Sequence, residues 1–353
     1  MSIPFLCCNG ADRATDRTRR NPVKAIQLKP RPPTVQGACV TKTPSERRES
    51  IRPISFAVIV YLNGEFLPSE RASVNVLDRG FLLGDGVYEG LRAFVGRAHS
   101  INRHTQRMRE GLAEAKIDWN PGAMGDLTHR LLDAAGLRDA FIYWQVTRGT
   151  PAPGHPARTR VPAGPLTPTV LGFCSPQPSI DAYTTPPTIH AATVPDTRWS
   201  RGRLKSISML GNVLSAMEAA DQGAREAIMV RDGLVSEACA CNVILAVPGR
   251  DGHTELVTPS LQSVPILAGV TRQIVLEVDR TIVERPVHAR ELEQASEIIL
   301  VGTTSLVTSV TMLDGRPISG GAPGPHATRL LQAYLDYVRA DLGFPMGLRA
   351  GAA

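Results

Sequence analysis

The sequence predicts an α+β protein with two mixed regions, and three observations lead to this fold class. Short β-branched runs and stretches with helical spacing of apolar residues both occur in each half of the chain. A proline-rich loop from 148 to 168 separates the halves. The N-terminal segment has no sustained apolar period. We therefore expect a disordered basic extension over 1–55, a small domain over 56–167, a linker over 168–178 and a large domain over 179–353.

The first region begins with a hairpin. Asn63-Gly64 is a strong two-residue turn, and it lies between a β-branched run at 56–62 and the returning strand that begins at Glu65. Apolar spacing predicts a helix over 102–116, for which Asn102 is a candidate N-cap. The other elements expected in this region are strands at 87–94 and 140–147 and a helix at 125–137.

The second region alternates helices with short apolar strands, and no internal repeat is visible. The expected helices are 209–222, 269–279 and 326–341. The expected strands lie near 226–230, 242–247 and 297–301.

Charge is distributed unevenly along the chain. The formal net charge is +6, but residues 1–55 alone hold 11 Lys+Arg and only four acidic residues, so the rest of the chain is close to neutral. A large basic surface for nucleic acid on the folded part is therefore not expected. A non-enzymatic protein that binds nucleic acid through its basic tail is one alternative that this reasoning leaves open.

Cysteine usage and hydropathy bear on metals and location. Cys239-x-Cys241 lacks a second pair of ligands, so we expect no metal site. The six cysteines show no disulfide framework, which favours a reducing compartment. No apolar run reaches the roughly 18–20 residues that span a bilayer, and the N-terminus is a poor secretory signal. We expect a cytoplasmic protein with no membrane partner.

A lysine stands out by its isolation. Only two lysines, Lys116 and Lys205, follow residue 55 in a region rich in arginine. Lysine can lose its proton and form a Schiff base, whereas arginine cannot, so Lys205 is a candidate for amine chemistry. A codon bias that replaces lysine with arginine explains the same observation equally well. Schiff-base chemistry also needs a carboxylate to pair with a pyridine nitrogen, and Glu237 is a candidate, although a solvated turn glutamate has the same appearance.

Nine segments, in order over about residues 58–340, resemble the fold-type-IV pyridoxal-phosphate (PLP) transaminases. This family holds D-amino-acid transaminases, branched-chain aminotransferases and aminodeoxychorismate lyase. The matching segments begin at Tyr61, Asp78, Asn102, Gln145, Asp196, Lys205, Ser236, Gly269 and Thr303. The resemblance implies a small α/β sandwich domain and a larger pseudo-barrel domain, with PLP as cofactor.

The resemblance also implies roles for single residues. Lys205 is similar to the Schiff-base lysine and Glu237 to the partner of the pyridine nitrogen. The implied phosphate-binding residues are Arg107, Val270, Thr271, Gly302 and Thr303. For Val270 and Thr271 the physics agrees, because the free N–H groups at the start of a helix attract an anion.

Substrate-facing residues are expected on two strands and in two loops. Strand alternation places Tyr88 on one face with Arg92, and Tyr143 on a similar face of its own strand. Thr304 lies where the family forms a substrate-facing turn. In the loop after 150, His155 matches the substrate-binding histidine of D-amino-acid transaminases, but Pro153 stands in place of their arginine. The candidates for the missing cation are Arg92, Arg158 and Arg160.

The expected activity is PLP-dependent transamination from a D-alanine-like amino acid to a 2-oxo acid, by a ping-pong mechanism in a homodimer. Branched-chain aminotransferases carry a tyrosine five residues after the lysine, where this chain has Leu210. The alternatives are a branched-chain L-aminotransferase, an (R)-amine transaminase and an aminodeoxychorismate lyase.

Overall fold

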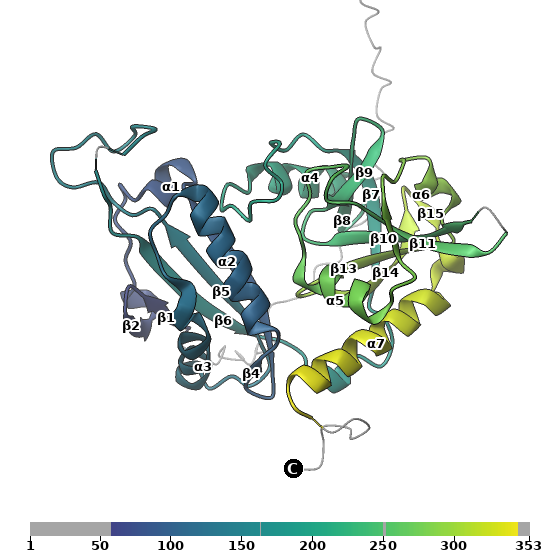
Figure 1. The fold of residues 1–353 in the computed structure, drawn as a ribbon, viewed down its shortest axis with the longest axis horizontal. Coiled ribbons are helices and arrows are strands. Elements are labelled where there is room, and N and C mark those ends of the chain that lie inside the picture. The colour runs from purple at the N-terminus through teal and green to yellow at the C-terminus, as the bar shows by residue number, and fades with distance from the viewer. Residues whose placement is uncertain (1–57, 163, 250–251, 345–353) are drawn as a thin grey trace, which may run out of the picture. The chain divides into compact units, whose positions relative to one another are not determined.

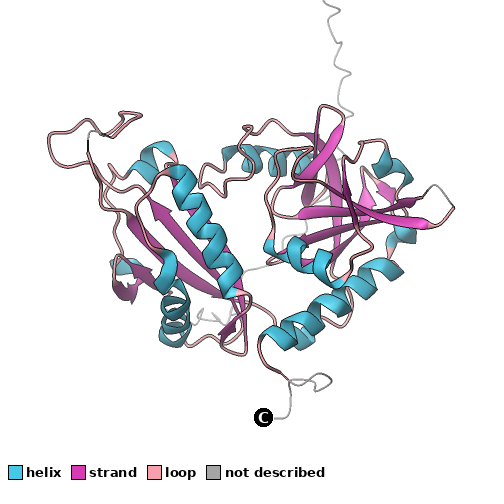
Figure 2. Ribbon diagram, in the orientation of Figure 1, coloured by secondary structure: helices cyan, strands magenta, loops and turns pink. Residues whose placement is uncertain are grey.

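The computed structural model describes residues 58–162, 164–249 and 252–344. The extension predicted over 1–55 lies outside the described residues. Within them the chain forms two β-sheets, each flanked by helices, so the predicted α+β class is confirmed (Figures 1 and 2).

The first sheet has six antiparallel strands in the order β2-β1-β6-β5-β3-β4. Its strands are β1 (Ile59–Leu62), β2 (Glu65–Pro68), β3 (Gly86–Phe94), β4 (Arg97–Ala98), β5 (Ala140–Thr147) and β6 (Thr169–Pro176). The predicted Asn63-Gly64 turn joins β1 to β2, and both of its residues have positive φ. Most of the segment predicted as a linker, 168–178, is β6 in the middle of this sheet. The division into domains stays a prediction.

Helices cover the first sheet. They are α1 (Arg79–Leu83), α2 (Ile101–Ala115) and α3 (Met124–Ala135), with α2 on β3 and α3 on β6 and β1. Side chains of β5 alternate, so that Ala140, Ile142, Trp144 and Val146 are buried in the core. The Asn102 N-cap prediction is wrong. The helix begins one residue earlier, after Ser100, whose backbone N–H donates to Asp341 Oδ2 at 2.8 Å.

The second sheet has nine strands, in the order β12-β11-β10-β13-β14-β7-β8-β9 with β15 on β14. The strands are β7 (Thr188–Pro195), β8 (Glu226–Arg231), β9 (Leu234–Ala238), β10 (Asn242–Pro248), β11 (Thr254–Pro259), β12 (Val283–Arg285), β13 (Glu297–Gly302), β14 (Leu306–Leu313) and β15 (Arg316–Pro317). Three neighbouring pairs are parallel: β11 with β12, β14 with β7, and β7 with β8. The end strand β9 also contacts β10 and β11, so the sheet curls back on itself.

Helices α4 (Leu210–Asp221), α5 (Val270–Val278), α6 (Glu291–Gln294) and α7 (Pro325–Asp341) accompany this sheet. One core lies between the sheet and α5 with α7, and a second lies inside the curl. Strand β13 is buried along its whole length because both of its faces meet a core. No helix in the described parts of the chain is long and apolar enough to cross a membrane.

Candidate active site

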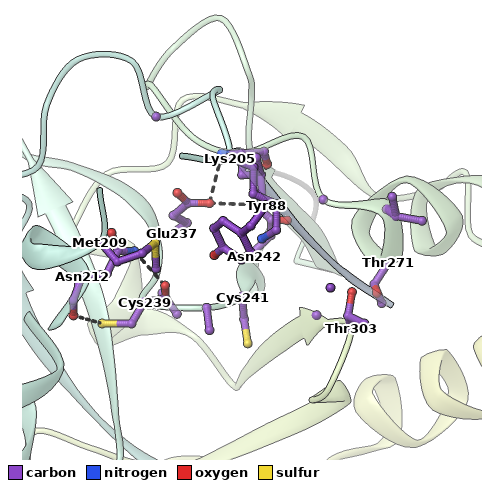
Figure 3. Close-up of a pocket in the computed structure, with 18 of the residues that line it drawn as sticks. Tyr88, Lys205, Met209, Asn212, Glu237, Cys239, Cys241, Asn242, Thr271 and Thr303 are labelled. Atoms are coloured by element: carbon purple, nitrogen blue, oxygen red, sulfur yellow. Dashed lines mark hydrogen bonds between the residues drawn. The ribbon is translucent and has the colours of Figure 1, made fainter. Parts of the chain in front are cut away.

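The predicted Schiff-base lysine lies in a cavity between the two sheets. Lys205 is in the 196–209 segment that joins β7 to α4, and its carbonyl accepts a hydrogen bond from Tyr88 N at 3.0 Å. Its Nζ lies 4.2 Å from the centroid of the Tyr88 ring. Figure 3 shows both side chains at the cavity. The segment thus runs beside β3 and presents the amine to the cavity next to an aromatic face.

Glu237 enters the same cavity from β9. The residue is 6% exposed, and three donors hold its carboxylate: Arg198 Nη1 at 2.7 Å on Oε1, and Leu267 N at 3.1 Å and Asn242 Nδ2 at 3.2 Å on Oε2. Burial raises the pKa of Glu237, and Arg198 opposes this shift. The cavity therefore brings together the amine and the buried carboxylate that the sequence offered as candidates.

The five residues predicted to bind phosphate also line this cavity. Val270 and Thr271 open α5, whose N-cap, Gly269, makes no side-chain capping bond. The first backbone N–H groups of a helix have no partner within it and point outward from its start. Gly302 and Thr303 come from the end of β13, and Figure 3 shows Thr271 and Thr303 toward the same side of the cavity.

Arg107 reaches the cavity from α2 and is already paired. Its Nε and Nη2 donate to the two oxygens of Glu89 at 2.7 and 2.8 Å, and its Nη1 donates to Ala268 O at 3.0 Å, just before α5. His104 Nδ1 also lies 2.8 Å from Glu89 Oε2. Burial acts to raise the pKa of Glu89, but Arg107 and His104 outweigh it and bring the pKa to about 2.

Two of the predicted substrate residues, Tyr88 and Thr304, line the cavity, and Tyr143 lies on the neighbouring strand β5. The rings of Tyr88 and Tyr143 stack at 5.5 Å, and Tyr143 stacks on Phe173 at 4.9 Å. The Tyr143 hydroxyl donates to Gln145 Oε1 at 2.8 Å. Tyr143 therefore contacts the cavity residue Tyr88 without being among the described residues that line the cavity.

The expectation for Arg92 needs correction. Arg92 is 1% exposed and does not line the cavity. Its guanidinium donates to Pro178 O at 2.9 Å and to the Tyr183 hydroxyl at 3.2 Å, and it lies 4.6 Å from the centroid of the Phe94 ring. The side chain leaves β3 toward the connection between the two sheets, although strand alternation does place it on the face of Tyr88.

His155 lies in the exposed 148–168 loop, away from the residues that line the cavity of its own chain. Arg79 holds this loop, because its guanidinium donates to Thr159 O at 2.5 Å and to Arg160 O at 3.1 Å. A substrate role for His155 stays a prediction.

Several cavity residues were not singled out from the sequence. Arg198 and Trp199 belong to the Asp196 segment, while Asn212 and Asn242 belong to segments that begin at Lys205 and Ser236. Their positions in segments that resemble the family could have identified them as cavity residues. Cys239 and Cys241 also line the cavity, and burial raises the pKa of both thiols to about 12.

Known proteins are similar to this chain in sequence and in fold. The family described as "Amino-transferase class IV" matches residues 86–313. The D-alanine aminotransferase of Bacillus licheniformis is 34% identical over 274 residues, which are 75% of this chain and 92% of that protein.

Two solved structures are similar at 24% identity, which shows the fold alone. A branched-chain aminotransferase from Thermoproteus uzoniensis has a TM-score of 0.68 over 82% of this chain and 96% of its own. The PLP-bound form of a hypothetical aminotransferase from Mycobacterium tuberculosis has a TM-score of 0.66 over 80% of this chain and 99% of its own. The chain belongs to the class IV aminotransferases, a family of PLP-dependent enzymes.

Proposed function

We propose that this enzyme moves an amino group from a D-amino acid such as D-alanine to a 2-oxo acid, in two half-reactions, with PLP bound at Lys205. The observation that carries the proposal is the convergence of Lys205, Glu237 and the start of α5 on one cavity. The choice of donor rests on the similarity to the D-alanine aminotransferase of B. licheniformis, an enzyme named for this substrate. A homodimer and a cytoplasmic location belong to the same proposal.

The residues present fit PLP. A phosphate requires N–H and hydroxyl donors with a positive charge nearby, and the start of α5, Thr271, Thr303 and Arg107 provide them. Gly302 lies close to two other cavity residues, since a Cβ there would be 3.0 Å from Cys241 Sγ and 3.2 Å from Ala240 O. Glu237 suits the ring nitrogen and Lys205 the aldehyde carbon.

When bound, PLP supplies an electron-withdrawing ring that weakens bonds at the α-carbon of an amino acid. The chain's own residues then have distinct tasks. Lys205 Nζ is the one lysine amine among the described residues that line the cavity, so it is the group suited to hold and move the α-proton. Glu237 retains a proton on the ring nitrogen, and Tyr88 restrains the lysine side chain through its ring face.

The cations at the cavity favour one second candidate, an (R)-amine transaminase. Among the described lining residues, Arg107 is paired with Glu89 and Arg198 with Asp196 and Glu237. Both guanidinium groups already have acidic partners, so neither is free to bind the carboxylate of a substrate. A donor without a carboxylate fits this observation, as does a cation from the 151–168 loop of a second copy.

Reduction with borohydride tests the attachment of PLP. The purified protein should be yellow, and the reduced cofactor should map to the peptide that contains Lys205. An adduct on Lys116, or none in PLP-loaded protein, contradicts the proposal.

A panel of amine donors tests the substrate. D-Alanine should be preferred to L-alanine, L-leucine and (R)-1-phenylethylamine, with a 2-oxo acid as acceptor. A preference for the carboxylate-free amine supports the second candidate. Release of pyruvate from aminodeoxychorismate over many turnovers without an acceptor points to lyase chemistry, because a transaminase without an acceptor stops after one half-reaction per site.

A further inference from the structure

Arg198 connects two acidic side chains at the cavity. Its Nε and Nη2 donate to the two oxygens of Asp196 at 2.9 Å each, while its Nη1 donates to Glu237 Oε1 at 2.7 Å. The guanidinium is planar and its donors point in fixed directions. One cation therefore joins the strand that carries Glu237 to the beginning of the segment that carries Lys205.

Asp196 is firmly held in its own right. Its side chain is 0% exposed, Ser236 Oγ donates to Oδ2 at 2.9 Å, and Arg231 Nη2 donates to Oδ1 at 3.0 Å. Burial acts to raise the pKa of Asp196, but Arg198, Ser236 and Arg231 outweigh it and bring the pKa to about 2. Asp196 thus stays ionised and fixes the orientation of Arg198.

The surroundings leave little freedom for Arg198. Gly211, at the start of α4, packs against it, and a Cβ at that position would lie 2.9 Å from Arg198 Cγ. Arg231 Nη2 also donates to Arg198 O at 2.6 Å, which holds the backbone. These contacts leave Nη1 directed at Glu237.

Glu237 has capacity for one more partner. Its two oxygens offer about four acceptor positions, and Arg198, Leu267 and Asn242 use three. Burial favours the neutral acid, and Arg198 is the strongest influence against it. A neutral acid cannot stabilise a positive charge on a neighbouring ring nitrogen, so the charge of Glu237 depends on Arg198.

We propose that Arg198 is a positioning residue for transamination, which keeps Glu237 ionised and fixed at the cavity so that the ring nitrogen of PLP stays protonated. This inference rests on the proposed function. It assigns Arg198 no contact with substrate and no proton transfer of its own. Its effect passes through Glu237.

The direct test is ¹⁵N NMR of the protein loaded with PLP labelled at the ring nitrogen. The wild type should show a protonated nitrogen across the pH range in which the protein is stable. Arg198→Gln should shift the signal toward the neutral nitrogen while PLP remains bound. Arg201→Gln is a matched control, because Arg201 lies on the same segment and its ion pair with Glu114 is exposed, with side chains 63% and 43% exposed. It should match the wild type.

A double-mutant cycle tests whether Arg198 acts through Glu237. Arg198→Gln should lower kcat about tenfold to a hundredfold in the wild-type background, as expected for a lost charge-assisted bond. In the Glu237→Gln background the same change should have an effect below about threefold. An equal loss in both backgrounds overturns the proposal.

Asp196→Asn covers the case in which Arg198→Gln does not fold. It weakens the fork that orients Arg198 and should move the nitrogen signal in the same direction, by a smaller amount. If the ring nitrogen of PLP stays fully protonated in the folded, PLP-loaded variants, the role of Arg198 is overturned, while the proposed function is not affected. A wild type that binds no PLP overturns the proposed function, and with it this inference.

Discussion

Glu89 places a buried negative charge next to Arg107, on the side of the cavity that we propose binds phosphate. It is 0% exposed and bonds both Arg107 and His104, so removal of its charge would leave two buried donors without a proper acceptor. Arg107 approaches the cavity with its direction set by this pair and by Ala268 O. At the scale of single residues, the phosphate side is thus fixed before any ligand arrives.

The pair makes stability depend on pH. The pKa of Glu89 falls from 4.5 to about 2 on folding, so its contribution is fully present above pH 4.5 and is lost as the pH falls toward 2. Burial is the main cause of the lowered pKa of His104. Because the folded protein therefore binds this proton less readily than the unfolded chain, His104 also lowers the unfolding free energy as the pH falls. Between pH 7 and pH 3.5 we expect Glu89 to account for about 1–2 kcal/mol of lost unfolding free energy.

Urea unfolding of the wild type and of Glu89→Gln at both pH values measures this. The variant should be less stable at pH 7 and lose less on acidification. Glu114→Gln, at an exposed position, should follow the wild type. Equal pH dependence in all three proteins would show that the Glu89 pair has no such linkage.

Among the elements, the approach of α5 to β10 determines the geometry of the cavity. Gly269 precedes α5, and a Cβ there would collide with Asn242 Oδ1, at the start of β10. The Asn242 amide nitrogen donates to Glu237 Oε2 and to Leu267 O at 3.0 Å. A glycine is therefore needed for the helix start and the carboxylate to share one asparagine.

Gly269→Ala should cost about 1–3 kcal/mol of unfolding free energy, as overpacking does, and should weaken PLP retention because Asn242 must move. Denaturant unfolding and dialysis of the PLP-loaded protein measure both effects. Gly125→Ala in α3 is the control: its Cβ would meet only Ile101 Cγ1, at 3.6 Å, and a helical Gly→Ala change should stabilise by up to about 1 kcal/mol. Unaltered stability in Gly269→Ala would show that Asn242 can relax freely.

The sequence predicted elements whose signal is local. Helices α2, α3, α4, α5 and α7 lie within a few residues of their predicted bounds, because each shows apolar spacing over at least two full turns. Strands β9, β11, β12 and β14 were not predicted, since a strand, even one of eight residues such as β14, is defined by partners that are distant in the chain. The same reason explains Arg92, because alternation assigns a face of a strand but not the direction of a long side chain.

In the molecule as a whole, hydrogen bonds join the two sheets. His99 Nδ1 lies 2.7 Å from Asp341 Oδ2, and Arg97 Nη1 donates to Leu342 O at 2.7 Å, so the end of α7 is fixed to the start of α2. Arg92 fixes the connection between the sheets through Pro178 and Tyr183. The cavity depends on these contacts because both sheets contribute to its lining.

Arg92→Ala should therefore lower the unfolding free energy by about 2–4 kcal/mol and leave donor preference unchanged. The KM values for D-alanine and for (R)-1-phenylethylamine should change by the same factor, as measured at a temperature where the variant is folded. Arg92→Met, which refills much of the volume, should recover part of the stability. A selective loss of amino-acid donors would show that Arg92 reaches the substrate in the assembled enzyme.

The parallel pairing of β7 with β14 sets an order for biosynthesis. All six strands of the first sheet lie within 59–176, so that sheet can close while the ribosome is still translating the rest. The strands β7, β8 and β9 pair with one another, and β9 carries Glu237. They join the rest of the second sheet through the pairing of β7 with β14, so they cannot do so until residues 306–313 have been synthesised. A product truncated before β14 would lack the strand beside β7, lose the cavity and expose an open strand edge to aggregation.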